Sequence, residues 1–314
     1  MFSIATGPAT IRLARLDDAA AISRIHQSHV PRWYRKTGGE HCEVGYEALT
    51  LDERYGFGGQ WMSTETCAIH LNNLLLSHHM PYVAETDGKP VAEMELFVSR
   101  EGPPYGRACH IGLLYVDKAF TGHGIGAMMV EKALQYAREN RCDSLTVSAT
   151  RATEEFYRRC GFAFRDALVE IEALPGDFIV DVAPLPPPLS LQSFTWGMNM
   201  HIGRLQSSAY HVFEAASEYA LASCMNVQRH IQYLTVNGHP SVFVCQCPVP
   251  GNAVVRGWSA GADAGDLVFA ALGKAAAMGV RTTNMLLCRK DYEHVEGLIE
   301  SRLIGTRRTL MIKL

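Results

Sequence analysis

Residues 113–127 read LLYVDKAFTGHGIGA, and this stretch determines how the first half of the chain folds. An apolar strand ends at Val116, a short polar turn follows, and three glycines then open an amphipathic helix predicted over 124–140. Glycine lacks the Cβ atom that would keep a ligand away from the backbone. Unpaired main-chain N–H groups at a helix start, together with the helix dipole, favour a pyrophosphate. The pattern therefore predicts a phosphate-binding turn.

Two other interpretations apply to a glycine-containing turn of this kind. Glycines also serve tight strand-to-helix turns that bind nothing. A dinucleotide site needs GxGxxG after the first strand of a parallel unit and an acid about 20 residues further on. Here the glycines stand at 122, 124 and 126, position 129 is not glycine, and an antiparallel hairpin is predicted before the turn. The dinucleotide interpretation therefore fails.

The flanking periodicity predicts a mixed sheet covered by helices. The predicted strands are 10–13, 82–85, 91–98, 108–116, 144–148 and 164–171, and the predicted helices are 17–27, 64–76, 124–140 and 152–160. Asp87-Gly88-Lys89-Pro90 predicts a hairpin turn. Residues 28–63 have no clear period and are rich in aromatic and charged side chains, Trp61 among them, so we expect an irregular substrate lid.

The strand, turn and helix resemble motif A of the GNAT N-acetyltransferase superfamily, with the signature Arg/Gln-x-x-Gly-x-Gly/Ala. Here it is Thr121-Gly122-His123-Gly124-Ile125-Gly126. A second stretch, TRATEEFYRRCGF at 150–162, is similar to the family's Asn-x-x-Ala-x-x-Phe-Tyr-x-x-x-Gly-Phe. The resemblance covers about residues 10–172. It implies an α/β GNAT fold, with a central mixed, mostly antiparallel sheet flanked by helices, and acetyl-CoA as cosubstrate without a metal.

The resemblance also assigns site residues. Tyr157 corresponds to the tyrosine that acts as general acid in many relatives; the alternative is an aromatic packed beside Phe156. The first signature position is Thr121 rather than Arg or Gln, and Thr150 and Thr153 replace the Asn and Ala of the second signature. Main-chain amides make most of the hydrogen bonds to the phosphates, so we expect these departures to weaken cofactor binding rather than abolish it. The implied cofactor-binding residues are Leu114, Tyr115, Val116, Thr121, Gly122, His123, Gly124, Ile125, Gly126, Ala127 and Thr150.

Three further side chains are candidates for the acceptor chemistry. His110 shares a strand face with Gly112, Leu114 and Val116 and is the candidate base, because an unperturbed imidazole titrates near neutrality. The alternative is a hydrogen-bonded strand histidine. Glu93 and Glu95 fall on one face of the neighbouring strand and could hold a cationic amine or relay a proton; the alternative is a solvated sheet face.

The second half is predicted to be a degenerate GNAT-like repeat. DVAPLPPPLSLQ (181–192) predicts a stiff spacer or a strap; the alternative is a loop inside one large domain. The spacer divides the chain into a catalytic domain at 1–180, a linker at 181–193 and a second domain at 194–314. Predicted there are helices 207–223, 263–278 and 293–302 and strands 233–236, 241–246, 253–259, 284–288 and 308–313. Its loop AGADAGD lacks the Gly-x-Gly spacing, and Leu298-Ile299 stand where Phe156-Tyr157 would be. We expect a structural wall of the substrate cleft or a dimer contact; the alternative is an unrelated α/β domain.

Composition narrows the functional classes. The chain has 314 residues, 47% apolar and 19% charged, with a formal charge of −3. This balance argues against a nucleic-acid binder. We expect no signal peptide and no membrane span. Nine scattered cysteines suit a reducing cytoplasm, and Cys245 and Cys247 are expected to pack in a core rather than hold a metal.

Together these observations predict a cytoplasmic acetyl-CoA-dependent N-acetyltransferase that acts on a primary amine by direct attack on the thioester. The alternative is a non-catalytic acyl-CoA-binding sensor. The acceptor can be a small molecule or a peptide, and a homodimer is left open.

Overall fold

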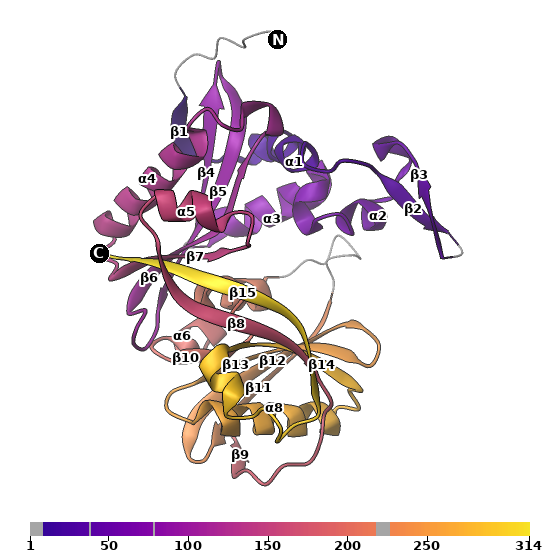
Figure 1. Ribbon diagram of the computed structural model, residues 1–314, viewed down its shortest axis with the longest axis vertical. Coiled ribbons are helices and arrows are strands. Elements are labelled where there is room, and N and C mark those ends of the chain that lie inside the picture. Colours follow the sequence, from indigo (N-terminus) through magenta and orange to yellow (C-terminus); the bar gives the residue numbers. More distant parts are fainter. Residues whose placement is uncertain (1–8, 38, 78, 218–226) are drawn as a thin grey trace. The chain divides into compact units, whose positions relative to one another are not determined.

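The computed structural model describes residues 9–37, 39–77, 79–217 and 227–314. The chain divides into two compact units, one formed by 1–97, 111–136 and 217–226 and the other by 98–110, 137–216 and 227–314. The predicted fold class is confirmed, because helices cover mixed sheets in which most strand pairs run antiparallel, while β13 runs parallel to β14 (Figure 1). The segment predicted as a linker, 181–193, lies within the second unit and does not separate the two units.

The first unit contains strands in the order β1-β4-β5-β6. Its elements are β1 (Thr10–Leu13), α1 (Ala19–Gln27), β2 (Tyr34–Thr37), β3 (Glu40–Glu43), α2 (Leu51–Tyr55), α3 (Thr64–Leu76), β4 (Met80–Thr86), β5 (Lys89–Arg100), β6 (Arg107–Val116) and α4 (Ile125–Glu139). The last residues of β5 and α4 and the first residues of β6 belong to the second unit. Asp87 and Gly88 have φ of 51° and 73°, as a tight hairpin turn requires, so the predicted hairpin is confirmed.

Helices cover both faces of β4. Val83 is fully buried and packs with Ile22 of α1 and Leu71 of α3. Tyr82 points to the opposite face, as strand alternation requires, and its ring lies 6.3 Å from that of Tyr136 on α4. Because Glu93 pairs in register with Val83, its side chain lies on the face covered by α1 and α3.

The prediction that 28–63 is irregular was wrong in part. Strands β2 and β3 form a separate hairpin, and α2 begins at Leu51 after a capping box between Thr50 and Glu53. The side chain of Glu53 also binds Arg35 of β2 at 2.6 Å, which ties the helix to the hairpin. The interaction is nonlocal, so hydrophobic periodicity does not reveal it.

The second unit has the strand order β7-β15-β8-β14-β10-β13-β12-β11-β9. Its elements are β7 (Ser144–Ala149), α5 (Glu154–Arg159), β8 (Ala163–Ala173), β9 (Val182–Pro184), α6 (Leu191–Thr195), β10 (Asn199–Ile202), α7 (Ser208–Ala216), β11 (Gln228–Val236), β12 (His239–Val249), β13 (Asn252–Ser259), α8 (Ala264–Ala277), β14 (Thr282–Cys288), α9 (Arg289–Glu293) and β15 (Ser301–Lys313). The chain's last strand, β15, lies between β7 and β8, and β8 in turn pairs with β14. Strands from the two halves of the sequence are therefore interleaved.

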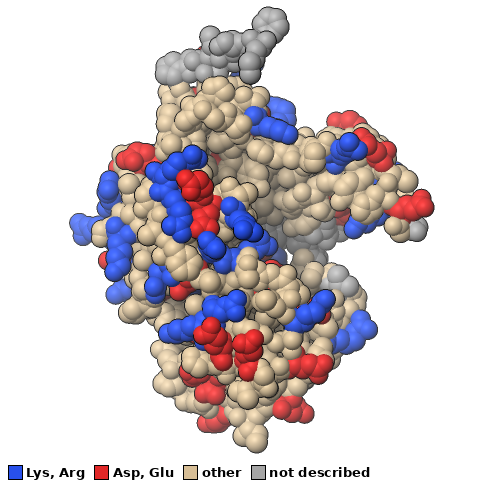
Figure 2. Space-filling view, in the orientation of Figure 1, with Lys and Arg blue, Asp and Glu red and all other residues tan. Residues whose placement is uncertain are grey.

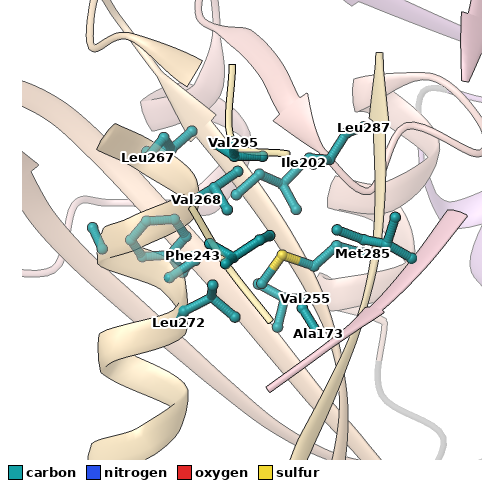
Figure 3. Packing of buried hydrophobic residues seen from close by; sticks show 14 of the residues in the cluster. Ala173, Ile202, Phe243, Val255, Leu267, Val268, Leu272, Met285, Leu287 and Val295 are labelled. Carbon is teal, nitrogen blue, oxygen red and sulfur yellow. The ribbon is translucent and has the colours of Figure 1, made fainter. Parts of the chain in front are cut away.

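A hydrophobic cluster that includes α8 packs against this sheet (Figure 3). Helix α8 contributes Leu267, Val268 and Leu272, which meet Phe243 of β12 and Met285 of β14. Cys245 belongs to the same core and Cys247 packs against it, which confirms their predicted packing role. All cysteines among the described residues are free thiols.

Two predictions in the second half need correction. No helix forms over 293–302: α9 ends at Glu293, Gly297 has φ of +80°, and β15 begins at Ser301. Long antiparallel pairing with β7 and β8 outweighs the local helical pattern. The proline-rich stretch is also not a free spacer, since β9 pairs with β11 at the sheet edge, where proline's missing N–H does no harm. The predicted helix 207–223 is observed as α7, and residues 218–226 lie outside the described residues.

The face in Figure 2 carries acidic side chains among the basic ones. Within the described ranges, no helix has both the length and the apolar character needed to cross a bilayer. Three expectations stay predictions: that the chain does not bind nucleic acid, that a homodimer is possible, and that the protein is cytoplasmic.

Candidate functional site

The turn between β6 and α4 adopts a conformation that demands glycine. Gly122 and Gly124 have φ of +81° and +83°, which L-residues rarely adopt, and a Cβ added at either would have nothing within 4 Å. Helix α4 begins at Ile125, whose side chain is buried. The glycines are therefore needed for the backbone path, and they leave open space beside it.

The main-chain N–H groups in the glycine part of this turn, at 122–127, have no acceptor among the described protein groups. The preceding turn closes on itself through Asp117, which accepts from the N–H of Ala119 and Phe120, and through the Thr121 hydroxyl, which donates to the carbonyl of Lys118. Among the described residues, no protein group accepts a hydrogen bond from the N–H groups of 122–127. The first engaged amide is that of Met128, bonded to the carbonyl of Gly124 at 3.1 Å. Exposed donors at the positive end of a 15-residue helix can bind an anion.

Leu114, Tyr115 and Val116 form the end of β6 beside this turn. Asp117 donates its N–H to the carbonyl of Val91 at 2.8 Å, so the strand stays paired until the turn begins. The carbonyl of Val116 accepts from His29 Nε2 at 2.7 Å. The predicted contacts of these residues with a cofactor stay a prediction.

A pocket of about 210 Å³ opens next to the end of β6 within the first unit. Its lining comes from α1 and the residues after it, from the segment after α2, and from β6. The lining residues are His26, His29, Val30, Phe57, Gly58, Trp61, Met62, Leu113 and Tyr115. Trp61, from the segment 28–63, thus lines a cavity, and the lid role of that segment stays a prediction.

Glu93 and Glu95 lie behind this pocket and are almost fully buried, so the solvated-face alternative is wrong. Glu93 Oε2 lies 2.6 Å from His26 Nε2. Glu95 Oε1 accepts from Trp61 Nε1 at 3.0 Å and lies 2.9 Å from His70 Nε2. Within the described part of the chain, Oε2 of Glu95 is buried without a hydrogen-bond partner. Helices α1 and α3 supply both histidines, which explains why the face is dry.

Burial determines the charge state of the Glu93–His26 pair. It raises the pKa of Glu93 well above its usual range, with a further rise from the neighbouring Glu95. It also lowers the pKa of His26 to about 3. Both pKa shifts disfavour the charged forms of the two groups, so burial opposes an ion pair at this contact.

His110 belongs to the second unit and is also buried. Its Nδ1 lies 2.8 Å from Thr146 Oγ1, and its Nε2 lies 2.8 Å from Gln206 Oε1. Burial lowers the pKa of His110 to about 4. Both ring nitrogens have protein partners, which favours the hydrogen-bonded alternative; the base role stays a prediction.

Tyr157 and Thr150 also lie in the second unit. Tyr157 on α5 is buried, with its ring 5.0 Å from Phe156 and 5.5 Å from Phe162. The Thr150 N–H donates to Thr153 Oγ1 at 3.1 Å, so the two departures from the second signature contact each other. The acid role of Tyr157 stays a prediction.

Sequence reasoning missed His26, His29 and His70. A signal was available for His26, because it follows Ile22 and Ile25 on the apolar side of a predicted helix, and a buried histidine needs a polar partner. Glu93 and Glu95 were the available partners. Helical spacing alone does not say which strand face a helix covers, so the pairing could not be predicted.

Comparison with known proteins places the site in a family context. Residues 45–162 match the acetyltransferase (GNAT) family. Glucosamine 6-phosphate N-acetyltransferase 1 from Oryza sativa subsp. japonica is 33% identical over 57 residues, which is 18% of this chain and 34% of that protein. The chain thus spans about a third of the length of this curated relative.

Two solved structures extend the similarity over nearly the whole chain. A GCN5-related N-acetyltransferase from Anabaena variabilis has a TM-score of 0.59 at 10% identity, covering 97% of this chain and 72% of that one. A second, from Kribbella flavida, has a TM-score of 0.56 at 13% identity, covering 98% and 71%. At such low identity the likeness establishes the fold alone.

Proposed function

We propose that this chain, whose residues 45–162 match the acetyltransferase (GNAT) family, transfers an acetyl group from acetyl-CoA to a primary amine. The observation that carries the proposal is the set of amides at 122–127, exposed at the start of α4 and unused by the described protein groups. They suit the pyrophosphate of coenzyme A. The end of β6 would hold the pantetheine arm and the thioester carbonyl.

Acetyl-CoA supplies the activated acetyl group; the protein has to orient the amine and manage protons. In the proposed arrangement the amine enters the pocket beside Tyr115. Tyr157 would donate its phenol proton to the leaving thiolate, a role carried over from the family signature. The second half, which lacks the glycine spacing and the phenol, is proposed to be structural.

A non-catalytic acyl-CoA sensor is the second candidate. It is favoured by Thr121 and Thr150, which replace polar side chains of the family signatures. The Thr121 hydroxyl donates its hydrogen bond to the carbonyl of Lys118, so it is not available to donate to a phosphate.

Release of free thiol from acetyl-CoA separates the two candidates. The purified chain is assayed with a panel of amines that includes glucosamine 6-phosphate, because of the similarity to the rice enzyme. Amine-dependent thiol release supports the enzyme. Coenzyme A binding by calorimetry without release on any amine supports the sensor, and absence of binding contradicts both.

A further inference from the structure

The pocket of the first unit has an aromatic wall with a defined geometry. The His26 ring stacks on Tyr115 at 4.3 Å between centroids with a 30° tilt, and on Trp61 at 5.3 Å with a 12° tilt. Trp61 is held in place by its hydrogen bond to Glu95, and His29 meets the edge of Tyr115. These stacked rings offer surface to an apolar or aromatic group, and ring faces also attract ammonium ions.

The surroundings of the pocket are unfavourable for binding an anion. Its lining contains neither Lys nor Arg, the side chains that usually bind phosphate and carboxylate groups. Immediately behind His26 and Trp61 lie the carboxyl groups of Glu93 and Glu95. Oε2 of Glu95, buried and without a partner among the described residues, adds a second acceptor there. An anionic group would therefore lose water and gain no cation.

The volume limits the size of the ligand. At about 210 Å³ the pocket is smaller than the 300–1,000 Å³ typical of drug-sized sites. Apart from the two histidines, the side chains that line it are apolar or aromatic.

We infer that the acceptor is a small primary amine that carries an apolar group and no phosphate or carboxylate. The inference rests on the proposed acetyl transfer and names its substrate class. The ammonium form is attracted by the ring faces, and the apolar group packs against Trp61 and Tyr115.

The test compares 2-phenylethylamine with glucosamine 6-phosphate in the thiol-release assay on the full chain. We expect kcat/KM for 2-phenylethylamine to be at least about 10-fold higher, a difference of the size that one pocket supplies. A 10-fold preference for the phosphorylated amine would overturn the substrate class and leave acetyl transfer intact.

Variants of the wall tie the preference to this pocket. Trp61→Ala should raise KM for 2-phenylethylamine about 10-fold while coenzyme A affinity is unchanged. Tyr115→Ala, at a more exposed position, should raise the same KM about 10-fold. Trp196→Ala, which changes an exposed tryptophan of the second unit, is the matched control and should leave KM unchanged. Unaltered KM in both wall variants would overturn the inference.

Direct binding keeps the inference testable without turnover. Binding of 2-phenylethylamine is measured by the quenching of tryptophan fluorescence. Saturable quenching that is weaker in Tyr115→Ala supports the inference, and absence of binding overturns it. Loss of coenzyme A binding and of acetyl transfer to every amine would instead count against the proposed function.

Discussion

The two halves of the sequence each contain a strand, a short turn and a helix, but the turns use their main-chain donors differently. Between β6 and α4 the amides of 122–127 have no acceptor among the described protein groups. Between β13 and α8, Asp263 accepts from the N–H of Gly265 at 2.8 Å, and Ser259 Oγ accepts from Gly261 and Ala262. The second turn is closed by its own side chains.

This difference teaches that a shared local architecture does not by itself make a phosphate site. The helix dipole is present in both turns, but at α8 the carboxylate of Asp263 already occupies the positive end. The first turn has glycines where the second has capping side chains.

Gly124→Val should have the largest effect. Valine disfavours φ of +83°, so the backbone would rotate and the amides would turn away from a common point. We expect coenzyme A affinity to fall at least about 100-fold, measured by calorimetry. Gly238→Val is the matched control, because Gly238 has φ of +79° and equally open space but lies in the β11–β12 turn. Retained affinity in Gly124→Val would mean that the phosphate site lies elsewhere.

Tyr157→Phe tests whether the phenol that the second half lacks has a chemical role. Removing a general acid should lower kcat about 100-fold and leave coenzyme A affinity unchanged. Tyr233→Phe, in the second unit, controls for the loss of a phenol and should leave kcat as it is. Unchanged kinetics in Tyr157→Phe would leave that residue with a packing role beside Phe156 and Phe162.

The pH dependence of stability tests whether His110, a polar residue in the first half of the sequence, has a structural role. Its pKa in the folded protein is about 4, below the ordinary 6.5, so the folded state resists protonation and stability present above pH 6.5 is lost as the pH falls towards 4. Between pH 7 and pH 5 this group should cost about 2 kcal/mol of unfolding free energy. Burial also lowers the pKa of His26 and His211, which adds to the loss, whereas the raised pKa of Glu93 acts in the opposite direction as the pH falls.

The measurement is denaturant unfolding at the two pH values. His110→Gln should reduce the pH-dependent loss by about 2 kcal/mol relative to the wild type. An identical pH dependence in variant and wild type would show that His110 keeps an ordinary pKa and would reopen its assignment as a base.

Substitutions of the two turn side chains, Asp263 and Thr121, should change the stability least. Asp263→Ala removes the side chain that caps α8, and the loss of an N-cap costs about 1 kcal/mol of stability, seen as a lower Tm. Thr121→Ala at the first turn removes a hydroxyl bonded only within an exposed loop and should cost less than about 0.5 kcal/mol. Equal losses at the two turns would contradict the different uses described for them.

Local patterns predicted most of the elements. The Asp87-Gly88 turn, β1 at Thr10–Leu13 and the amphipathic helix α4 follow from residues within one or two turns of one another. The helix expected over 293–302 failed because Gly297 and the pairing of β15 with β7 and β8 outweigh its periodicity. Strand pairing over more than 100 residues leaves no local signal.

The sequence by itself determined the glycine turn, because positive φ at Gly122 and Gly124 is a property of two residues and their neighbours. It also placed Glu93 and Glu95 on one strand face. Only the tertiary structure decided that α1 and α3 cover that face, which turns two candidate solvated acids into buried partners of His26, His70 and Trp61. The reason is that a side chain's charge and role depend on what excludes water from it, and distant segments do that here.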